Sequence, residues 1–371
     1  MPATEAAAPT DAAFLTIDLA AVVANWRLLQ RTAGGVATAA VVKADGYGLG
    51  ALPVARALAA AGCCTFFVAH LEEALALRDA LVEPEIGVLN GCPAGAEPLF
   101  VAHRLTPVLN ELGRIDAWLA FAAGRADAPP AILHVDTGMN RLGLPPDEVP
   151  RVRAHPRFAA CAWRNVMSHL ACADEPDHPL NETQRGRFET VRSALPGWRS
   201  SLAASSGIFL GAGYRFDEVR PGAALYGVAP QAGRPNPLAQ PVRLQAKILQ
   251  VRRVDRGESV GYGAAHTTRE STKIATVAIG YADGYLRTAS GRGNMRIAGV
   301  AVPVIGRVSM DLITLDVGAL PDAAVVPGTL VDVLDAQRTP DDLARDAGTI
   351  GYEILTSLGA RYRRHYVGGP A

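Results

Sequence analysis

Apolar runs of strand length alternate with amphipathic helical stretches over the first two thirds of the chain. A short strand is predicted at residues 14–17, and Asp18 is placed to N-cap a helix whose apolar positions recur at helical spacing. Further apolar runs end in loops that bear Gly or Asp, and helical patterns lie between most of them. These predicted strands cover residues 36–42, 65–69, 85–90, 105–109, 131–136, 163–168, 200–204 and 223–226. Such repeated strand–helix units predict an α/β fold, with a (β/α)8 barrel as the most economical arrangement.

The pattern changes near residues 233–241, which hold Gly233 and several prolines and are typical of a linker. Beyond this segment, short runs with apolar and polar residues in alternation are separated by turns and few helices. The runs cover residues 242–254, 273–279, 295–304, 309–317 and 329–334. They predict a mostly antiparallel β-domain. We therefore expect a loose N-terminus over 1–12, a barrel over 13–236 and a β-domain over 237–371.

Composition narrows the class of protein. The chain has 371 residues, 49% of them apolar, which is enough for two domains with sizeable cores. Basic and acidic residues balance at 36 each, so no net charge draws the protein to nucleic acid or to an acidic membrane. No apolar stretch is long enough to span a bilayer, and no secretory signal is visible. Five cysteines without C-x-x-C spacing argue against a disulfide framework or a zinc site, and we expect a cytoplasmic protein without a metal.

Lysine is scarce, which draws attention to the few that remain. Only Lys43, Lys247 and Lys273 occur among the 36 basic residues. Lys43 ends an apolar run, so a barrel would place its amine at the carboxyl end of a strand, where barrel enzymes keep their sites. An amine in such apolar surroundings can form an imine with an aldehyde cofactor. The alternative is a strand-end lysine that reaches solvent, which is also how we interpret Lys247 and Lys273.

The residues around Lys43, VVKADGYGLG, resemble the pyridoxal-phosphate (PLP) lysine motif of the alanine racemase family. Further blocks resemble that family in its own order and cover nearly the whole chain. They are HVDTGMNRLG (134–143), SHL (168–170), RPGAALYG (220–227), VGYG (260–263), IGYADGY (279–285), GRVSMD (306–311) and TIGYEIL (349–355). The resemblance implies a PLP-binding barrel followed by a β-domain, in agreement with the pattern of apolar residues.

The resemblance also implies catalytic roles. Lys43 would bind PLP covalently and carry a proton on one face of the amino acid. Racemisation needs a second proton carrier on the opposite face, because a single group can only return the proton where it took it; Tyr262 matches the family's second base. His169 and Arg220 match the residues that make its phenolate accessible. Arg220 would also contact the pyridine nitrogen, and because arginine does not accept a proton there, transamination is suppressed.

Binding roles follow from the same resemblance. The positions that match the family's phosphate ligands are Tyr47, Ser206, Gly222, Ala223 and Tyr352. Arg141 and the main-chain N–H of Met310 match the groups that bind the substrate carboxylate. Because Tyr262 and Met310 belong to the β-domain and Lys43 to the barrel, the resemblance implies a head-to-tail homodimer whose active sites are shared.

The match has departures from the family pattern. Many members have a carbamylated lysine seven residues before Arg141, and this chain has His134, whose imidazole cannot form a carbamate. A bound anion such as chloride, or His134 itself, would then orient Arg141. Ser205 stands where Asn is frequent, and Ser309 where Cys is frequent. Neither of these last two changes touches the proposed proton carriers.

These observations favour an alanine racemase that interconverts L- and D-alanine, either for peptidoglycan or for alanine catabolism. An amino-acid racemase of broader specificity remains the alternative. A basic-amino-acid decarboxylase of the same fold would need a glutamate in place of Arg220 and a cysteine in the second domain, and all five cysteines lie in the first. A non-catalytic PLP-binding barrel or a sugar-metabolising barrel would not explain the C-terminal domain.

Overall fold

The computed structural model describes residues 11–369, so residues 1–10 of the predicted loose N-terminus lie outside the described part. The described chain forms two compact units. One comprises Val22–Leu238, and the other comprises residues 11–21 together with Ala239–Gly369. No helix in the described range is long and apolar enough to cross a membrane.

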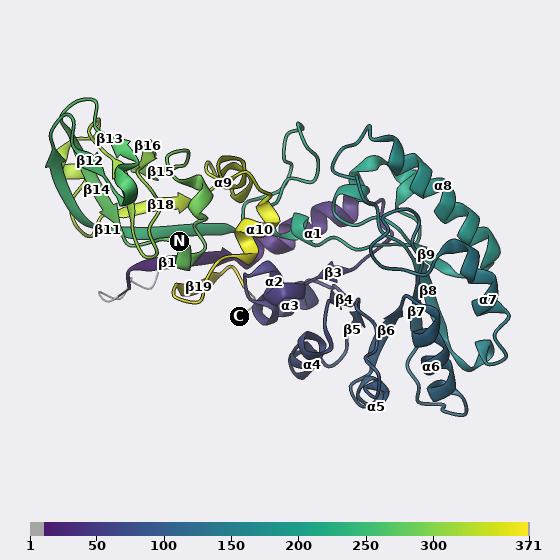
Figure 1. Ribbon diagram of the computed structural model, residues 1–371. Coiled ribbons are helices and arrows are strands. Elements are labelled where there is room, and N and C mark those ends of the chain that lie inside the picture. The colour runs from purple at the N-terminus through teal and green to yellow at the C-terminus, as the bar shows by residue number, and fades with distance from the viewer. Residues whose placement is uncertain (1–10, 370–371) are drawn as a thin grey trace. The chain divides into compact units, whose positions relative to one another are not determined.

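Parallel strands form the centre of the first unit (Figure 1). They are β2 (Ala37–Thr38), β3 (Ala40–Val41), β4 (Thr65–Val68), β5 (Glu85–Val88), β6 (Leu105–Leu109), β7 (Ala131–His134), β8 (Trp163–Met167), β9 (Arg199–Ser201) and β10 (Glu218–Val219). Strands β3 to β9 pair in chain order, and β10 pairs with β2. The N–H of Arg220 donates to Ala203 O at 2.9 Å and that of Ala39 to Val219 O at 3.0 Å, so β10 joins β9 to β2. The strands therefore close into the predicted barrel.

Helices cover the outside of these strands (Figure 1). They are α1 (Leu19–Thr32), α3 (Ala51–Ala60), α4 (Leu71–Ala80), α5 (Glu97–Ala102), α6 (Leu112–Ala122), α7 (Val149–Arg153) and α8 (Pro179–Ala194), and the short segment α2 (Lys43–Tyr47) follows β3 at its carboxyl end. The predicted N-cap of α1 is confirmed, because Asp18 Oδ1 accepts from the N–H of Ala21 at 3.0 Å. The apolar stripe of this helix, including Val22, Trp26 and Leu29, is buried as its spacing predicts.

One predicted barrel strand is wrong. Residues 223–226 form a 3₁₀ turn, η5 (Ala223–Tyr226), and the eighth strand is β10, a few residues earlier. The Ser205 hydroxyl oxygen accepts from the N–H of Gly222 at 3.0 Å and from that of Ala224 at 3.2 Å. These donors are therefore unavailable to a sheet ladder. An apolar run alone does not reveal that a distant side chain will accept the hydrogen bonds of its main-chain N–H groups.

The second unit is a β-domain, as predicted. Its strands are β1 (Ala13–Asp18), β11 (Val242–Val254), β12 (Ser259–Val260), β13 (His266–Thr267), β14 (Thr272–Val277), β15 (Asn294–Ile297), β16 (Val300–Ile305), β17 (Ile313–Asp316), β18 (Leu330–Leu334) and β19 (Arg363–Val367), with helices α9 (Pro340–Ala347) and α10 (Gly351–Thr356). The main sheet runs β14-β17-β16-β15-β18-β11-β1-β19, and β14 also pairs with β11. Its pairs are antiparallel except β1 with β19.

Strand β1 pairs with strands of the β-domain, although the sequence pattern assigns residues 13–236 to the barrel. Leu15 lies opposite Leu244 in an antiparallel pair with β11 and beside Arg364 in a parallel pair with β19. An isolated apolar run does not specify which sheet will satisfy its main-chain groups, and here the partners lie more than 200 residues away in the sequence. The first described residues, 11–21, therefore belong to the β-domain unit, and the barrel unit follows from Val22.

Candidate active site

Lys43 follows β3, at the carboxyl end of a barrel strand, as predicted. Burial and the positive charge of Arg141 lower the pKa of its amine, and the carboxylate of Glu73 acts in the opposite direction. A lowered pKa increases the fraction of neutral amine near neutral pH. Neutral amine is the form that attacks a carbonyl carbon and accepts a proton.

The segment after Lys43 is a left-handed turn rather than an ordinary helix. The φ/ψ angles are 53°/50° at Ala44, 52°/49° at Asp45 and 62°/43° at Gly46, and φ stays positive at Tyr47 and Gly48. Left-handed backbone costs a residue other than Gly about 1–2 kcal/mol, and here three such residues adopt it. Strain of this kind persists where the surrounding structure imposes it, which is common at functional sites.

The left-handed turn brings Tyr47 against the main chain of Gly222. A Cβ atom at position 222 would lie 2.2 Å from the Tyr47 phenol oxygen, so only glycine fits there. The Tyr47 ring also packs on Tyr226, with centroids 4.9 Å apart. Two segments that the sequence resemblance assigns to phosphate binding are thus adjacent in space.

The other barrel residues assigned to the phosphate lie at the starts of short 3₁₀ turns. Ser206 opens η3 (Ser206–Leu210); the residue is largely buried, and its hydroxyl makes no hydrogen bond to another described residue. Ala223 opens η5, and the first N–H groups of such turns have no partner within the turn. The N–H of Gly222 donates to Ser205, so Gly222 contributes its lack of a side chain. The Ser206 hydroxyl, the Tyr47 phenol and the main-chain N–H of Ala223 are donors that fit the phosphate of an aldehyde such as PLP.

Arg220 is buried and firmly held. Its guanidinium donates to the Ser201 hydroxyl and, at 2.6 Å, to Ser168 O, while Ser201 donates to Glu218 O at 2.7 Å. Burial lowers the pKa of Arg220 to about 10, so it remains a cation at neutral pH. Burial and the charges of Arg220 and Arg141 lower the pKa of His169 to about 3. The arrangement therefore combines a fixed cation with a neutral imidazole.

A polar network that the sequence analysis missed holds the segment around His169. Gln184 is fully buried; its amide donates to His169 O at 2.9 Å and accepts from the N–H of Ala171 at 2.8 Å. The Ser168 hydroxyl contacts that of Thr137 at 2.7 Å. Gln184 lies on α8 on the same buried face as Phe188 and Val191, so its spacing is that of a core position, but its amide side chain is of a type that is usually solvated.

Arg141 is exposed, and no ion pair joins it to a carboxylate in residues 11–369. Its charge lowers the pKa of Lys43, of His134 and of His169. His134 is buried at the end of β7, and burial above all lowers its pKa to about 4, which makes it neutral. A guanidinium close to Lys43 without a carboxylate partner in the described chain suits an anionic substrate group such as a carboxylate.

The remaining predicted residues lie in the β-domain. Tyr262 sits between two glycines with positive φ, Gly261 and Gly263, and its side chain is 70% exposed. A Cβ at position 263 would approach the guanidinium of Arg307 to 3.0 Å, so this loop lies beside the 306–311 loop that carries Met310, which is 53% exposed. Tyr352 is at the start of α10 and is partly exposed. The structure thus brings Tyr262 and Met310 onto neighbouring loops.

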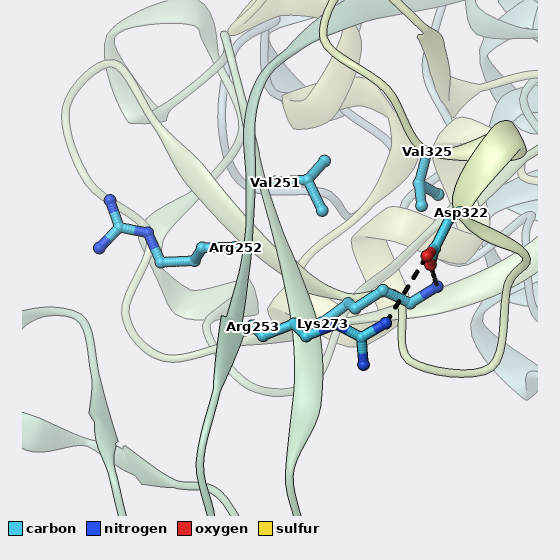
Figure 2. A pocket seen from close by; sticks show the side chains of 6 residues that line it. All are labelled: Val251, Arg252, Arg253, Lys273, Asp322 and Val325. Atoms are coloured by element: carbon cyan, nitrogen blue, oxygen red, sulfur yellow. Dashed lines mark hydrogen bonds and ion pairs between the residues drawn. The ribbon is translucent and has the colours of Figure 1, made fainter.

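The two other lysines have structural partners. Lys273 is buried, contrary to the expectation of a solvated side chain: its amine donates to Leu320 O and, at 2.6 Å, to Asp322. Figure 2 shows the Asp322 carboxylate between Lys273 and Arg253, at the pocket that Val251, Arg252 and Val325 also line. Lys247 lies over the Phe14 ring, 5.4 Å from its centroid. Neither amine lies at the carboxyl end of a barrel strand, as that of Lys43 does.

Comparisons with known proteins agree with this geometry. Two family models match, the alanine racemase N-terminal domain over residues 17–230 and the alanine racemase C-terminal domain over residues 241–366. An alanine racemase of Rhodospirillum rubrum is 51% identical over 359 residues, 96% of each chain. A catabolic alanine racemase of Mesorhizobium japonicum is 50% identical over 370 residues, 99% of this chain and 96% of that one.

Solved structures give the same result. The crystal structure of alanine racemase from Bartonella henselae, with covalently bound pyridoxal phosphate, is 40% identical and superimposes with a TM-score of 0.92, covering 96% of this chain and 99% of that one. The biosynthetic alanine racemase from Pseudomonas aeruginosa is 36% identical with a TM-score of 0.88, covering 96% and 99%. On the matches to both of its domains and on these relatives, the chain belongs to the alanine racemase family.

Proposed function

We propose that Lys43 and Tyr262 are the two proton carriers of this enzyme and act on opposite faces of alanine. Family membership establishes the reaction and the cofactor: the chain is a PLP-dependent alanine racemase that interconverts L- and D-alanine. The assignment of Lys43 rests on one observation. Its amine has a lowered pKa and lies at the end of a barrel strand, next to the contact between Tyr47 and Gly222.

Each of the other residues has a task that its surroundings support. When bound, PLP supplies the electron-withdrawing system that makes the α-hydrogen of the amino acid acidic. Tyr47, Ser206, Ala223 and Tyr352 bind the phosphate, and Gly222, which lacks a side chain, leaves the space for the Tyr47 phenol beside them. Each of these residues offers a hydroxyl or main-chain donor, or lacks a side chain where one would collide.

The substrate and the phenol need their own partners. Arg141, which lacks an ion pair with any described residue, and the N–H of Met310 bind the substrate carboxylate. Arg220 remains positively charged and His169 remains neutral, and we assign to both the supporting role beside Tyr262 that the family resemblance implies.

The quaternary structure that we propose is a head-to-tail homodimer with shared active sites. Tyr262 and Met310 are large apolar or aromatic side chains exposed on adjacent loops, as expected of a surface that meets a partner. We propose that the enzyme works in the cytoplasm on free alanine. The similarity to catabolic as well as biosynthetic relatives leaves both peptidoglycan supply and alanine breakdown as uses of the reaction, and nothing favours a broader substrate range.

Cofactor attachment can be tested by borohydride reduction of the holoenzyme followed by peptide mapping. We expect the pyridoxyl mass on Lys43, because Lys273 is engaged by Leu320 and Asp322 and Lys247 by Phe14. A Lys43→Ala variant, treated in the same way, should carry no label. A pyridoxyl group on Lys247 or Lys273 in the unmodified sequence would contradict the proposed site.

Sharing of the active sites can be tested with mixed dimers. Lys43→Ala and Tyr262→Phe protomers should each be inactive alone and should regain activity when subunits exchange. A heterodimer holds one site in which Lys43 and Tyr262 are both intact, since they come from different chains. Racemase assays before and after exchange, with exchange verified by native mass spectrometry, measure the effect. Verified heterodimers without activity would mean that each site draws both residues from one chain.

A further inference from the structure

The carboxylate of Glu73 joins two segments of the barrel. Its Oε1 accepts from the N–H of Ala44 at 2.6 Å, and its Oε2 accepts from the N–H groups of Ala69 at 2.8 Å and His70 at 3.0 Å. Ala69 and His70 lie between β4 and α4, whereas Ala44 directly follows Lys43. One side chain therefore ties the first peptide of the left-handed turn to the neighbouring strand–helix junction.

Capping of α4 explains only part of this arrangement. Glu73 occupies the third position of α4, from which a glutamate commonly reaches back to the N–H of the N-cap residue, here His70. That contact uses one carboxylate oxygen. The other oxygen is directed to Ala44, 29 residues earlier in the chain, where φ is +53°. Alanine has no intrinsic preference for left-handed backbone, so its own conformational preference does not hold this peptide in place.

We propose that Glu73 is a positioning residue for the racemase reaction, which fixes the direction of the Lys43 side chain by holding the peptide that follows it. The inference rests on the proposed role of Lys43. A base that must reach the α-carbon from one face tolerates little displacement, so a peptide fixed at Ala44 limits where the amine can lie. Nothing else that contacts the Ala44 N–H is found among the described residues.

Glu73 also contributes a charge. Its carboxylate raises the pKa of the Lys43 amine, in opposition to burial and to the cation of Arg141. His169, the other titratable group coupled to Lys43, stays neutral because its own pKa is about 3. Removing the negative charge of Glu73 should therefore lower the pKa of Lys43, and deprotonation of the free amine would then occur at lower pH.

Two substitutions separate position from charge. Glu73→Gln keeps the size of the side chain but removes the charge and places an amide N–H₂ opposite main-chain donors. Glu73→Asp keeps the charge and remains able to cap α4, but it is one methylene shorter and should lose the contact with Ala44. Glu72→Gln is the matched control, because Glu72 is the exposed neighbour on the same turn.

Three measurements on the holoenzymes test the proposal: kcat and KM for D-alanine across pH, the rate at which hydroxylamine removes PLP, and the temperature of thermal unfolding. We expect both Glu73 variants to lose about 10–100-fold in kcat, with a much smaller change in KM. Both should release PLP faster. Only Glu73→Gln should move the acid limb of the kcat profile to lower pH, since only it removes the charge. Glu72→Gln should match the unmodified enzyme in all three.

The outcomes that would overturn the proposal are specific. If both Glu73 variants lower only the unfolding temperature, with unchanged kcat and PLP release, Glu73 is a helix cap and nothing more. If Glu73→Asp retains full kcat, the Ala44 contact does not position the lysine. Failure of the proposed function would give a different result. In that case, peptide mapping would find the pyridoxyl group on another lysine of the unmodified enzyme.

Discussion

Tyr262→Phe should lower the rate of racemisation by roughly 10²–10⁴-fold, the usual contribution of a general acid–base group. The variant should still hold PLP, because Lys43 and the phosphate-binding residues are unchanged. A phenylalanine ring fills the same space as the tyrosine ring but carries no proton. The exposed phenol of Tyr262 lies in a glycine-flanked loop, so its removal should disturb the β-domain core very little.

Hydrogen exchange in D₂O gives the sharper measurement. If the two bases serve opposite faces, Tyr262→Phe should still exchange the α-hydrogen of the enantiomer that faces Lys43, which the family resemblance assigns as D-alanine. Exchange of L-alanine should fall with racemisation. Tyr366→Phe, which also removes an exposed phenol of the β-domain, should behave like the unmodified enzyme. Equal exchange of both enantiomers in Tyr262→Phe, or nearly intact racemisation, would refute the assignment of one base to each face.

Much of the fold is predictable because strand and helix periods are local properties of the sequence. The longest strand, Val242–Val254, agrees with its prediction at both ends, and Asp18 caps α1 as expected. The pattern misleads where a distant group decides the outcome. Ser205 captures the N–H groups of Gly222 and Ala224, so an apolar run becomes a turn. Similarly, the Lys273 amine is buried because it donates to Asp322 and to Leu320 O, although the alternation of apolar and polar residues along its strand predicts a solvated side chain.

In the candidate site, too, local features could be predicted from the sequence and features that depend on distant contacts could not. The scarcity of lysine and the position of Lys43 after an apolar run are properties of the sequence, and they suffice to single out this residue. The left-handed conformation of Ala44 leaves no trace in its residue type, since alanine disfavours positive φ, whereas Asp45 is of a type that adopts it occasionally. Glu73 and Gln184 escape prediction because an acidic or amide side chain on a helix is ordinarily solvated. Their roles come from contacts with main-chain groups of other segments.

The largest effect on stability is expected from Arg164, at the opposite ends of the barrel strands from Lys43. Its guanidinium donates two hydrogen bonds to Glu218, at 2.7 and 2.8 Å, and a further one to Glu85 at 2.7 Å. These residues stand at the first or second positions of β5, β8 and β10. Although burial opposes the charge, the bonds to Glu218 and Glu85 raise the pKa of Arg164. At the amino-terminal face of a barrel, such a network serves stability rather than chemistry.

Arg164→Met should cost about 3–5 kcal/mol of folding free energy, because Glu218 is only 1% exposed and would lose its bidentate partner. In a unit of this size, 1 kcal/mol corresponds to roughly 2–4 °C in the midpoint of thermal unfolding. Arg125→Met is the control, since the Arg125–Asp127 pair is solvent-exposed and worth at most about 1 kcal/mol.

The double variant Arg164→Met/Glu218→Leu distinguishes a buried unpaired charge from lost packing. Removing both charges leaves no fully buried carboxylate without a cationic partner, so much of the stability should return, less the hydrogen bond that the buried Asn165 amide donates to Glu218. Thermal unfolding followed by circular dichroism measures all three variants. The kcat of Arg164→Met at 25 °C should remain close to that of the unmodified enzyme, because the network lies at the strand ends away from Lys43. A single variant no less stable than Arg125→Met would mean that water reaches Glu218 and takes the place of the guanidinium.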